Sequence, residues 1–167
     1  PSGCALFLAE VGEDRNTIQP LLGNHPEELF PKPSTSQGDD SLSADLEISQ
    51  LNASVTISLP DENKAIERWD IRIENSSDRV RTLKLAPYLE WMLNDPAVDR
   101  NHTQYNRLYP EVSYNASLNA AMALHRHTGK VGLLACDRKP DGFLSGRVDF
   151  IGRAGSIWDP RALQTFD

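Results

Sequence analysis

LEISQLNASVTISLPDENKAIERWDIRIEN, residues 46–75, alternates apolar and polar side chains in several runs. The alternating apolar positions are Leu46, Ile48, Val55, Ile57, Leu59, Trp69, Ile71 and Ile73. Successive side chains of a strand point to opposite faces of a sheet, so this pattern predicts half-buried antiparallel strands. Polar turn sequences, PDEN at 60–63 and ENSSD at 74–78, separate the runs at the spacing expected of a sandwich.

Further strands are predicted on both sides of this stretch. ALFLAEV (5–11) forms one, and residues 79–93 form another in which Pro87 indicates a sheet edge or a bulge. Four short segments follow, namely EVSYNASL, NAAMALHRH, KVGLLACD and RVDFIGR. The Ala-rich residues 117–127 could form a helix, but the neighbouring strands and the turn at Thr128-Gly129 favour a strand.

Residues 17–44 cluster Pro, Ser, Gly and Asp too densely for a regular element, which predicts a long irregular loop. We therefore expect an N-terminal strand and a Pro/Ser-rich loop or linker over residues 1–45, and a β-sandwich core over residues 46–167, as one domain overall. The fold class expected is all-β, a two-layer antiparallel β-sandwich.

Composition excludes some classes of partner. The chain has 167 residues, 39% hydrophobic, and its net charge of −7 argues against binding nucleic acid or an anionic membrane surface. No stretch approaches the roughly 20 apolar residues of a membrane span, and no signal-peptide pattern occurs. Because the chain begins with Pro1, we expect it to be part of a longer or processed protein.

Cysteine and histidine spacing gives no firm metal site. Cys4 and Cys136 fit neither a metal motif nor a disulfide framework, and we expect two reduced, buried thiols. His125 and His127 could project two imidazoles to one face of a strand and hold a transition metal. The alternative is that these histidines lie on an exposed face, or that one of them is partly buried and hydrogen-bonded. The absence of a third ligand at suitable spacing favours this alternative over a metal site. Neither a metal nor a cofactor is expected.

No catalytic residue is assigned from the sequence. A glycosidase needs two carboxylates at a defined separation, and no pair can be chosen here. Glu67, Asp70 and Glu74 lie on the solvent side of a predicted strand, where charge is expected. The sequence contains no nucleophile elbow, phosphate-binding Gly loop or HExxH motif.

The loop predicted from Asn94 to Tyr109 carries side chains that suit carbohydrate. Planar amides and guanidinium groups donate and accept in pairs that match vicinal hydroxyls, and Tyr packs on the apolar face of a sugar ring. The alternative is a solvated inter-strand loop, as most polar loops are.

Several pieces in order resemble glycoside hydrolase family 94, which comprises cellobiose and chitobiose phosphorylases and the phosphorylase-like part of cyclic β-1,2-glucan synthases. They are KAIERWDIRIENSSDRVRTLKLAPYLEWML, a D-x-x-H loop (Asp99 to His102), GLLACDRKP and RVDFIGRAGSIWDPRAL. The likeness spans residues 54–166, whereas residues 1–45 match poorly. Its motifs include Tyr88-x-Glu90, Arg147-x-x-Phe150-Ile151-Gly152 and the tail from Asp159 to Leu163.

The resemblance implies a supersandwich of the galactose-mutarotase-like type that precedes a helical (α/α)6 catalytic barrel. In that family phosphate cleaves a β-glucosidic bond with inversion, assisted by an Asp of the barrel. The chain itself is therefore expected to be inactive alone, while the parent would be a phosphorylase or glycosyltransferase. Within the parent enzyme, this chain would act as a scaffold and would supply a loop that contacts the sugar acceptor.

By the same resemblance, the expected substrate-binding residues are His102, Gln104, Asn106 and Arg107. Thr103-Gln104-Tyr105-Asn106-Arg107 ahead of Glu111-Val112 parallels the N-F-Q-R-N-like run of cellobiose phosphorylases. Cyclic glucan synthases instead have D-x-x-H-P-A-F, where Asp99 and His102 match but Thr103 and Gln104 differ. The branch and the glucan linkage stay open.

The expected partners are a β-glucan or disaccharide, the helical catalytic domain of the parent chain and a second copy in a homodimer. The expected location is cytoplasmic, either free or as the cytoplasmic part of a bacterial inner-membrane protein. An alternative function is a dimerisation module without ligand, with Trp91, Met92 or Trp158 at the interface. An independent hydrolase is the least favoured alternative.

Overall fold

The computed structural model describes residues 3–106 and 108–164, apart from the side chains of residues 99 and 103–106. The chain forms two compact units. The first unit comprises Pro1–Tyr88 with Ser156–Asp167, and the second comprises Leu89–Gly155.

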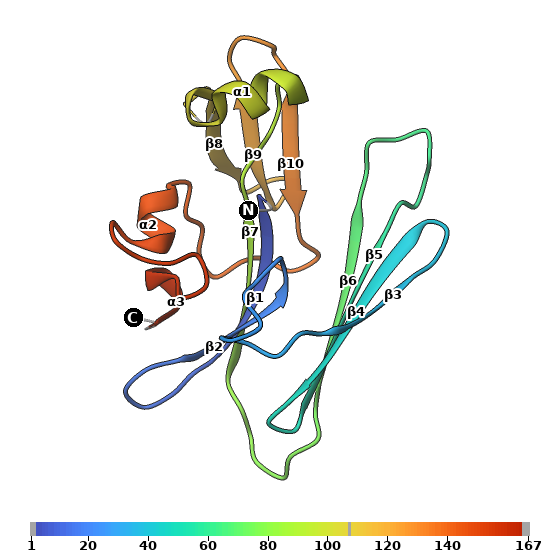
Figure 1. Cartoon of the computed structure of the whole chain (residues 1–167), viewed down its shortest axis with the longest axis vertical. Coiled ribbons are helices and arrows are strands. Elements are labelled where there is room, and N and C mark those ends of the chain that lie inside the picture. The colour runs from blue at the N-terminus through green and yellow to red at the C-terminus, as the bar shows by residue number, and fades with distance from the viewer. Residues whose placement is uncertain (1–2, 107, 165–167) are drawn as a thin grey trace. The chain divides into compact units, whose positions relative to one another are not determined.

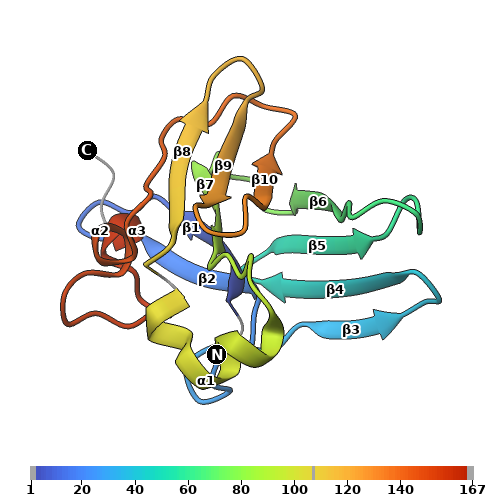
Figure 2. The ribbon, with the colours of Figure 1, turned by 90° about the horizontal axis from the view of Figure 1, so that it is seen from above.

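The first unit contains two sheets, with strand orders β2-β1-β7 and β3-β4-β5-β6 (Figures 1 and 2). Their strands are β1 (Cys4–Glu10), β2 (Thr17–Leu22), β3 (Ser34–Gln37), β4 (Ser41–Ile48), β5 (Leu51–Ser58), β6 (Arg68–Asn75) and β7 (Leu83–Leu89). β3 to β6 pair antiparallel in chain order, and β1 pairs antiparallel with β2. β7 is an edge strand, which agrees with the prediction from Pro87.

The alternation that predicts the fold is present in the structure. Val55 pairs with Ile71, and Ile57 pairs with Trp69, so the apolar positions of β5 and β6 share one face. Along β6, from Arg68 to Glu74, every second residue is exposed and those between are half-buried. The predicted all-β sandwich is confirmed, because strands dominate the chain and two sheets pack around one core.

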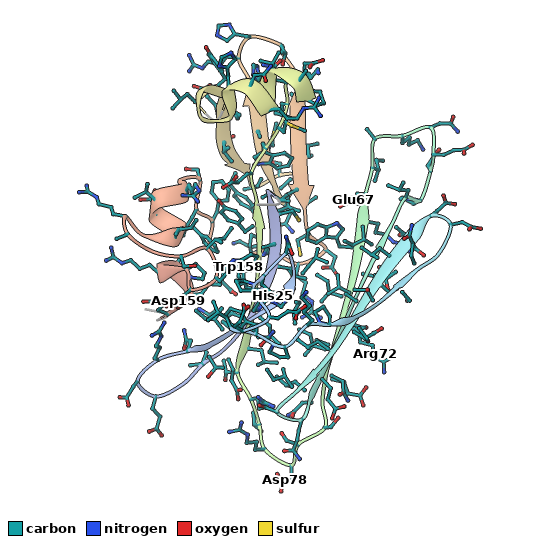
Figure 3. All side chains as sticks on the ribbon, in the orientation of Figure 1. His25, Glu67, Arg72, Asp78, Trp158 and Asp159 are labelled. Atoms are coloured by element: carbon teal, nitrogen blue, oxygen red, sulfur yellow. The ribbon has the colours of Figure 1, made fainter. Side chains whose placement is uncertain are left out.

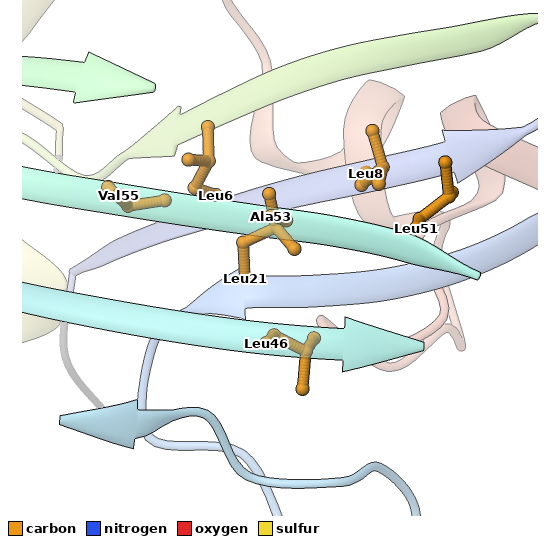
Figure 4. Packing of buried hydrophobic residues seen from close by; sticks show 7 residues of the cluster. All are labelled: Leu6, Leu8, Leu21, Leu46, Leu51, Ala53 and Val55. Atoms are coloured by element: carbon orange, nitrogen blue, oxygen red, sulfur yellow. The ribbon is translucent and has the colours of Figure 1, made fainter. Parts of the chain in front are cut away.

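The core of the first unit joins its two sheets (Figure 4). β1 and β2 contribute Leu6, Leu8 and Leu21, and the second sheet contributes Leu46, Leu51, Ala53 and Val55. All seven are at most 7% exposed. Burying a Leu or Val side chain stabilises a fold by about 1.5–3 kcal/mol, so these residues hold the two layers together.

The prediction of an irregular loop over residues 17–44 is wrong for much of its length. β2, β3 and the first half of β4 lie there, and residues 23–33 and 38–40 lack a strand or helix. β2 contains Pro20, and all four residues of β3 are polar and exposed, so neither strand shows an apolar alternation. The division into residues 1–45 and 46–167 stays a prediction, although β4 runs across residue 45.

The second unit contains a sheet of order β10-β9-β8 with two helices. Its elements are α1 (Pro96–Asn106), β8 (Pro110–Asn115), β9 (Ala120–His125), β10 (Val131–Ala135) and α2 (Arg147–Ile151). The preference for a strand over a helix in residues 117–127 is confirmed by β9. The prediction of a strand at RVDFIGR is wrong, because Arg147–Ile151 form a short helix that buries Ile151.

Gly132 allows a close approach on one face of this sheet. A Cβ atom at Gly132 would lie 2.4 Å from Cζ3 of Trp91. The absence of a side chain at residue 132 therefore lets the Trp91 ring lie directly on β10, where any other residue would displace it.

The residues that follow the second unit, from Ser156 onward, belong to the first unit. α3 (Arg161–Gln164) contacts β2, and Pro160 and Leu163 are buried. The Nδ2 of Asn16 donates to the carbonyl of Leu163 at 3.0 Å, and the backbone N–H of Asn16 donates to the carbonyl of Gln164 at 3.0 Å. These contacts fix residues 156–164 against the β1–β2 hairpin.

Neither cysteine forms a disulfide within the described residues. The prediction that both are buried is wrong for Cys136, which is exposed, and Cys4 is half-buried. The helices in the described ranges are each too short or too polar to span a bilayer.

Candidate functional site

The segment predicted to contact sugar, residues 94–109, is called the α1 segment because it contains helix α1. The Oδ1 of Asp95 accepts hydrogen bonds from the backbone N–H of Ala97 at 2.7 Å and of Val98 at 3.4 Å. Pro96 takes the first helical position, where its fixed φ suits a helix and its missing N–H has no partner to lose. The prediction of an irregular loop is therefore wrong here, because the segment contains a capped helix.

A kink at His102 divides the helix. His102 has φ of −138° and ψ of 43°, outside the helical region. Arg100, Asn101 and His102 are consecutive and exposed. The segment thus presents a guanidinium, a carboxamide and an imidazole to solvent next to a break in the helix. Each can donate hydrogen bonds to hydroxyl groups.

Only part of the predicted substrate-binding set can be placed. His102 lies at the kink and is exposed. Gln104 and Asn106 lie in the second part of α1, but their side chains are outside the described part of the structure. Arg107 lies outside the described residues altogether. The role of all four residues stays a prediction.

An aromatic contact ends the α1 segment. The ring centroid of Tyr109 lies 5.5 Å from that of His125 and 4.6 Å from that of His127. His125 ends β9 and is buried, whereas His127 lies in the following turn and is exposed. The two histidines therefore do not form a pair on one strand face. Over residues 3–106 and 108–164, no group of three or more His, Cys, Asp or Glu residues is arranged to hold a metal ion.

The buried ring of His125 is only partly satisfied. Its Nδ1 accepts the backbone N–H of Thr128 at 3.2 Å, which places the proton of the neutral ring on Nε2. Nε2 is buried and has no hydrogen-bond partner in the described part of the chain. Leaving a buried N–H unpaired costs about 1–3 kcal/mol, and the Tyr109 contact offsets some of that cost.

Glu10 and Asp159 are two of the four carboxyl groups, within the described residues, whose pKa is lowered in an ion pair. The hydrogen bond from Arg81 lowers the pKa of Glu10, and the hydrogen bond from Arg15 lowers the pKa of Asp159. A glycosidase general acid needs the opposite, a pKa raised toward neutrality. Glu10 and Asp159 are therefore held ionised and serve structure or binding.

Sequence reasoning missed the residues that organise the α1 segment. Asn94-Asp95-Pro96 is a helix-start signal, since Asp is favoured at the N-cap and Pro at the first helical position. This signal could have predicted the helix. The contact of Tyr109 with His125 had no such signal, because it joins positions on different elements.

The comparison with family models identifies this chain. The model for "Glycosyl hydrolase 94, supersandwich domain" matches residues 35–167. No curated protein sequence matches the chain significantly. The matched region begins inside β3 and includes β4 to β7 of the first unit together with the whole second unit. Because this match covers well over half of the 167 residues, the chain belongs to the glycosyl hydrolase 94 supersandwich domain family.

Proposed function

We propose that this β-sandwich domain is a non-catalytic part of a β-glucan phosphorylase or glucan synthase. In that enzyme it would act as a scaffold and contact the sugar through the α1 segment. Membership of the glycosyl hydrolase 94 supersandwich family supports the class of parent enzyme. The chemistry belongs to a helical catalytic domain of the same parent. The proposed partners are that domain and a neutral β-glucan or disaccharide, and the proposed location is cytoplasmic.

The observation that carries the sugar contact is the exposed run at the helix kink. Arg100, Asn101 and His102 lie together in solvent, and Asp95 fixes the start of the helix that bears them. Hydroxyl groups of a sugar both donate and accept, so a row of planar polar side chains suits them better than a single charge would. Unlike most surface loops, this segment has a backbone held by a cap, which reduces the ordering cost of binding.

An NMR titration tests this proposal. The ¹⁵N-labelled chain is titrated with cellobiose, sophorose and laminari-oligosaccharides, and amide shifts are followed. We expect shifts concentrated in residues 100–109 with at least one of these sugars. Arg100→Ala should weaken binding about fivefold, the effect of losing roughly one hydrogen bond.

Arg138→Ala is the matched control. Arg138 is an exposed arginine of the same unit outside the α1 segment, so its loss should leave the affinity unchanged. If no sugar shifts residues 100–109, or if Arg138→Ala weakens binding as much as Arg100→Ala, the proposed contact is wrong.

A second candidate function, assembly through a sheet face, rests on one observation. Leu124 pairs with Val131 across β9 and β10, and Leu133 lies two residues further along the same face. These side chains are 41%, 52% and 55% exposed. Of the positions suggested by sequence, Met92 is exposed while Trp91 and Trp158 are half-buried. Apolar rows of this kind mark protein contacts.

Analytical ultracentrifugation of the wild type and of Leu133→Lys separates the assembly function from a purely monomeric one. A dimer that dissociates on the substitution would support assembly through this face. A wild-type chain that sediments as a monomer at all concentrations would contradict it.

A further inference from the structure

The first unit contains an open cavity of about 270 Å³ that shares no residue with the α1 segment. Its lining comes from the end of the β1–β2 turn, from strand β2, from the irregular segment before β3 and from residues 158–159 of the C-terminal segment. The lining residues are Arg15, Asn16, Ile18, Phe30, Trp158 and Asp159. Small-molecule sites commonly have volumes of roughly 300–1,000 Å³, so a cavity of this size suits one small ring.

Aromatic contacts hold one wall of the cavity in place. The ring of Trp158 lies 6.2 Å from that of Phe7 and 5.9 Å from that of His25, between centroids. His25 in turn makes an edge contact with Phe30 at 5.8 Å. Figure 3 labels His25 beside Trp158 and Asp159 on the same side of the first unit. Both aromatic lining side chains are therefore positioned through one buried histidine.

A glycine permits this placement of Trp158. Gly23 has φ of +126°, a conformation that L side chains rarely adopt, and a Cβ there would lie 3.1 Å from the Trp158 ring. The ring thus packs directly on the backbone at residue 23. The wall is built before any ligand arrives, which lowers the entropy cost of binding.

An ion pair forms the polar rim of the cavity. Nη2 of Arg15 donates to both carboxylate oxygens of Asp159, at 2.5 and 2.6 Å. The two side chains are 56% and 48% exposed, so they reach solvent at the cavity mouth. Asn16 is committed inward, since its amide donates to the carbonyl of Leu163 and accepts from the N–H of Gly12.

We propose that this cavity binds one neutral pyranose ring of a glucan chain. Trp158 and Phe30 offer apolar surface to the C–H face of the ring, and the guanidinium and carboxylate at the rim offer donors and acceptors to its hydroxyls. Because Arg15 and Asp159 neutralise each other, the rim has no net charge with which to select a phosphate or an ammonium group. A neutral polyhydroxylated ligand matches both the aromatic wall and the polar rim of the cavity.

The first part of the test follows the indole N–H resonance of Trp158 in the ¹⁵N-labelled chain. Methyl β-glucoside is the probe, because it presents a single ring. We expect a saturable shift of the Trp158 indole signal while those of Trp69 and Trp91 stay in place. No shift at Trp158 overturns the proposal, and so does an equal shift with inorganic phosphate alone.

The second part of the test changes a residue of the polar rim. Asp159→Asn removes the carboxylate charge at an exposed position and should weaken methyl β-glucoside binding about tenfold, because hydrogen bonds to charged groups contribute most. Arg68→Gln is the matched control, since it removes a comparably exposed ion pair with Asp70 on β6. Melting curves verify that each variant is folded. Equal affinity of Asp159→Asn and the wild type overturns the proposal.

The two glycan proposals fail separately. Shifts at residues 100–109 without a shift at Trp158 support sugar contact by the α1 segment and overturn sugar binding in the cavity. Shifts at Trp158 alone support the cavity and contradict the α1 segment.

Discussion

Nε of Arg147 donates a hydrogen bond to Oε1 of Glu90 at 3.0 Å, although 57 residues separate them in the chain. Glu90 follows β7 and belongs to the Tyr-x-Glu sequence, and Arg147 opens helix α2 and the R-x-x-F-x-G sequence. Two short motifs of the family resemblance thus meet in the second unit. In this chain the two motifs therefore contribute the opposite charges of one ion pair.

A double-mutant cycle on this pair should give a small favourable coupling. Arg147 is 55% exposed and Glu90 is 18% exposed, so solvent screens the interaction. Glu90→Gln, Arg147→Gln and the double variant are compared by urea unfolding, and we expect a coupling energy of about 0.5–1 kcal/mol. A coupling energy of zero would show that the two motifs are not joined through this contact.

Asp95→Ala should unwind the start of α1. The carboxylate caps two backbone N–H groups that have no intrahelical partner, and losing such a cap costs about 1 kcal/mol. Hydrogen exchange of the Ala97 and Val98 amides should become faster, while strand β9 keeps its protection. Asp141→Ala, an exposed aspartate of the same unit, is the control and should change neither amide. Unchanged exchange in Asp95→Ala would contradict the capping role.

Sequence reasoning succeeded where one physical effect dominates. The alternation of Val55, Ile57, Ile71 and the neighbouring positions requires a half-buried strand pair, and the structure contains it. Strand β3 could not be predicted because its four polar residues have no buried face, and its contacts with β4 are backbone pairing and one hydrogen bond from the Ser34 hydroxyl. Helix α2 could not be predicted because it has five residues, and helices this short depend on tertiary contacts more than on propensity. Helix α1 was missed although Asn94-Asp95-Pro96 marks its start.

The candidate sites could be predicted only in part for a similar reason. The α1 segment is continuous in sequence, so its polar composition was enough to predict it as a candidate sugar-binding segment. The cavity joins Arg15 to Asp159 across 144 residues, and only the fold brings them together. Tyr109 and His125 meet in the same way, from different elements.

Stability at low pH should depend on Glu10. Nε of Arg81 donates to Oε1 of Glu10 at 2.8 Å, and this hydrogen bond lowers the pKa of Glu10 below its ordinary value of 4.5. Because the folded-state pKa lies below the unfolded-state pKa, the pair stabilises the fold fully above the unfolded value. That stabilisation is lost as the pH falls through the lowered pKa.

Urea unfolding between pH 7 and pH 3 measures this effect. The wild type should lose stability more steeply than Arg81→Gln over the acid part of this range, since the variant lacks the largest cause of the lowered Glu10 pKa and keeps only the smaller effect of Arg79. Arg68→Gln removes an exposed pair on β6 and should retain the wild-type slope. Identical slopes for the wild type and Arg81→Gln would contradict the assignment.

The two thiols should react at very different rates. Burial, with a smaller contribution from the negative charge of Glu67, raises the pKa of Cys4 to about 11, whereas Cys136 is exposed. The thiolate is the reactive form, so at pH 8 a disulfide reagent should modify Cys136 first and Cys4 slowly. Cys136→Ser should abolish the fast phase and Cys4→Ser the slow one. Two equal rates in the native wild type would contradict the burial of Cys4.

Intermolecular nuclear Overhauser effects between a bound glucan and the protein show directly whether the α1 segment contacts the sugar. The ¹⁵N,¹³C-labelled chain is saturated with the unlabelled oligosaccharide that gives the largest shifts, and filtered spectra select contacts between sugar C–H protons and the protein. We expect contacts to Arg100, Asn101, His102 or Tyr109. Sugar contacts confined to residues outside 94–109, or none at saturation, would contradict it.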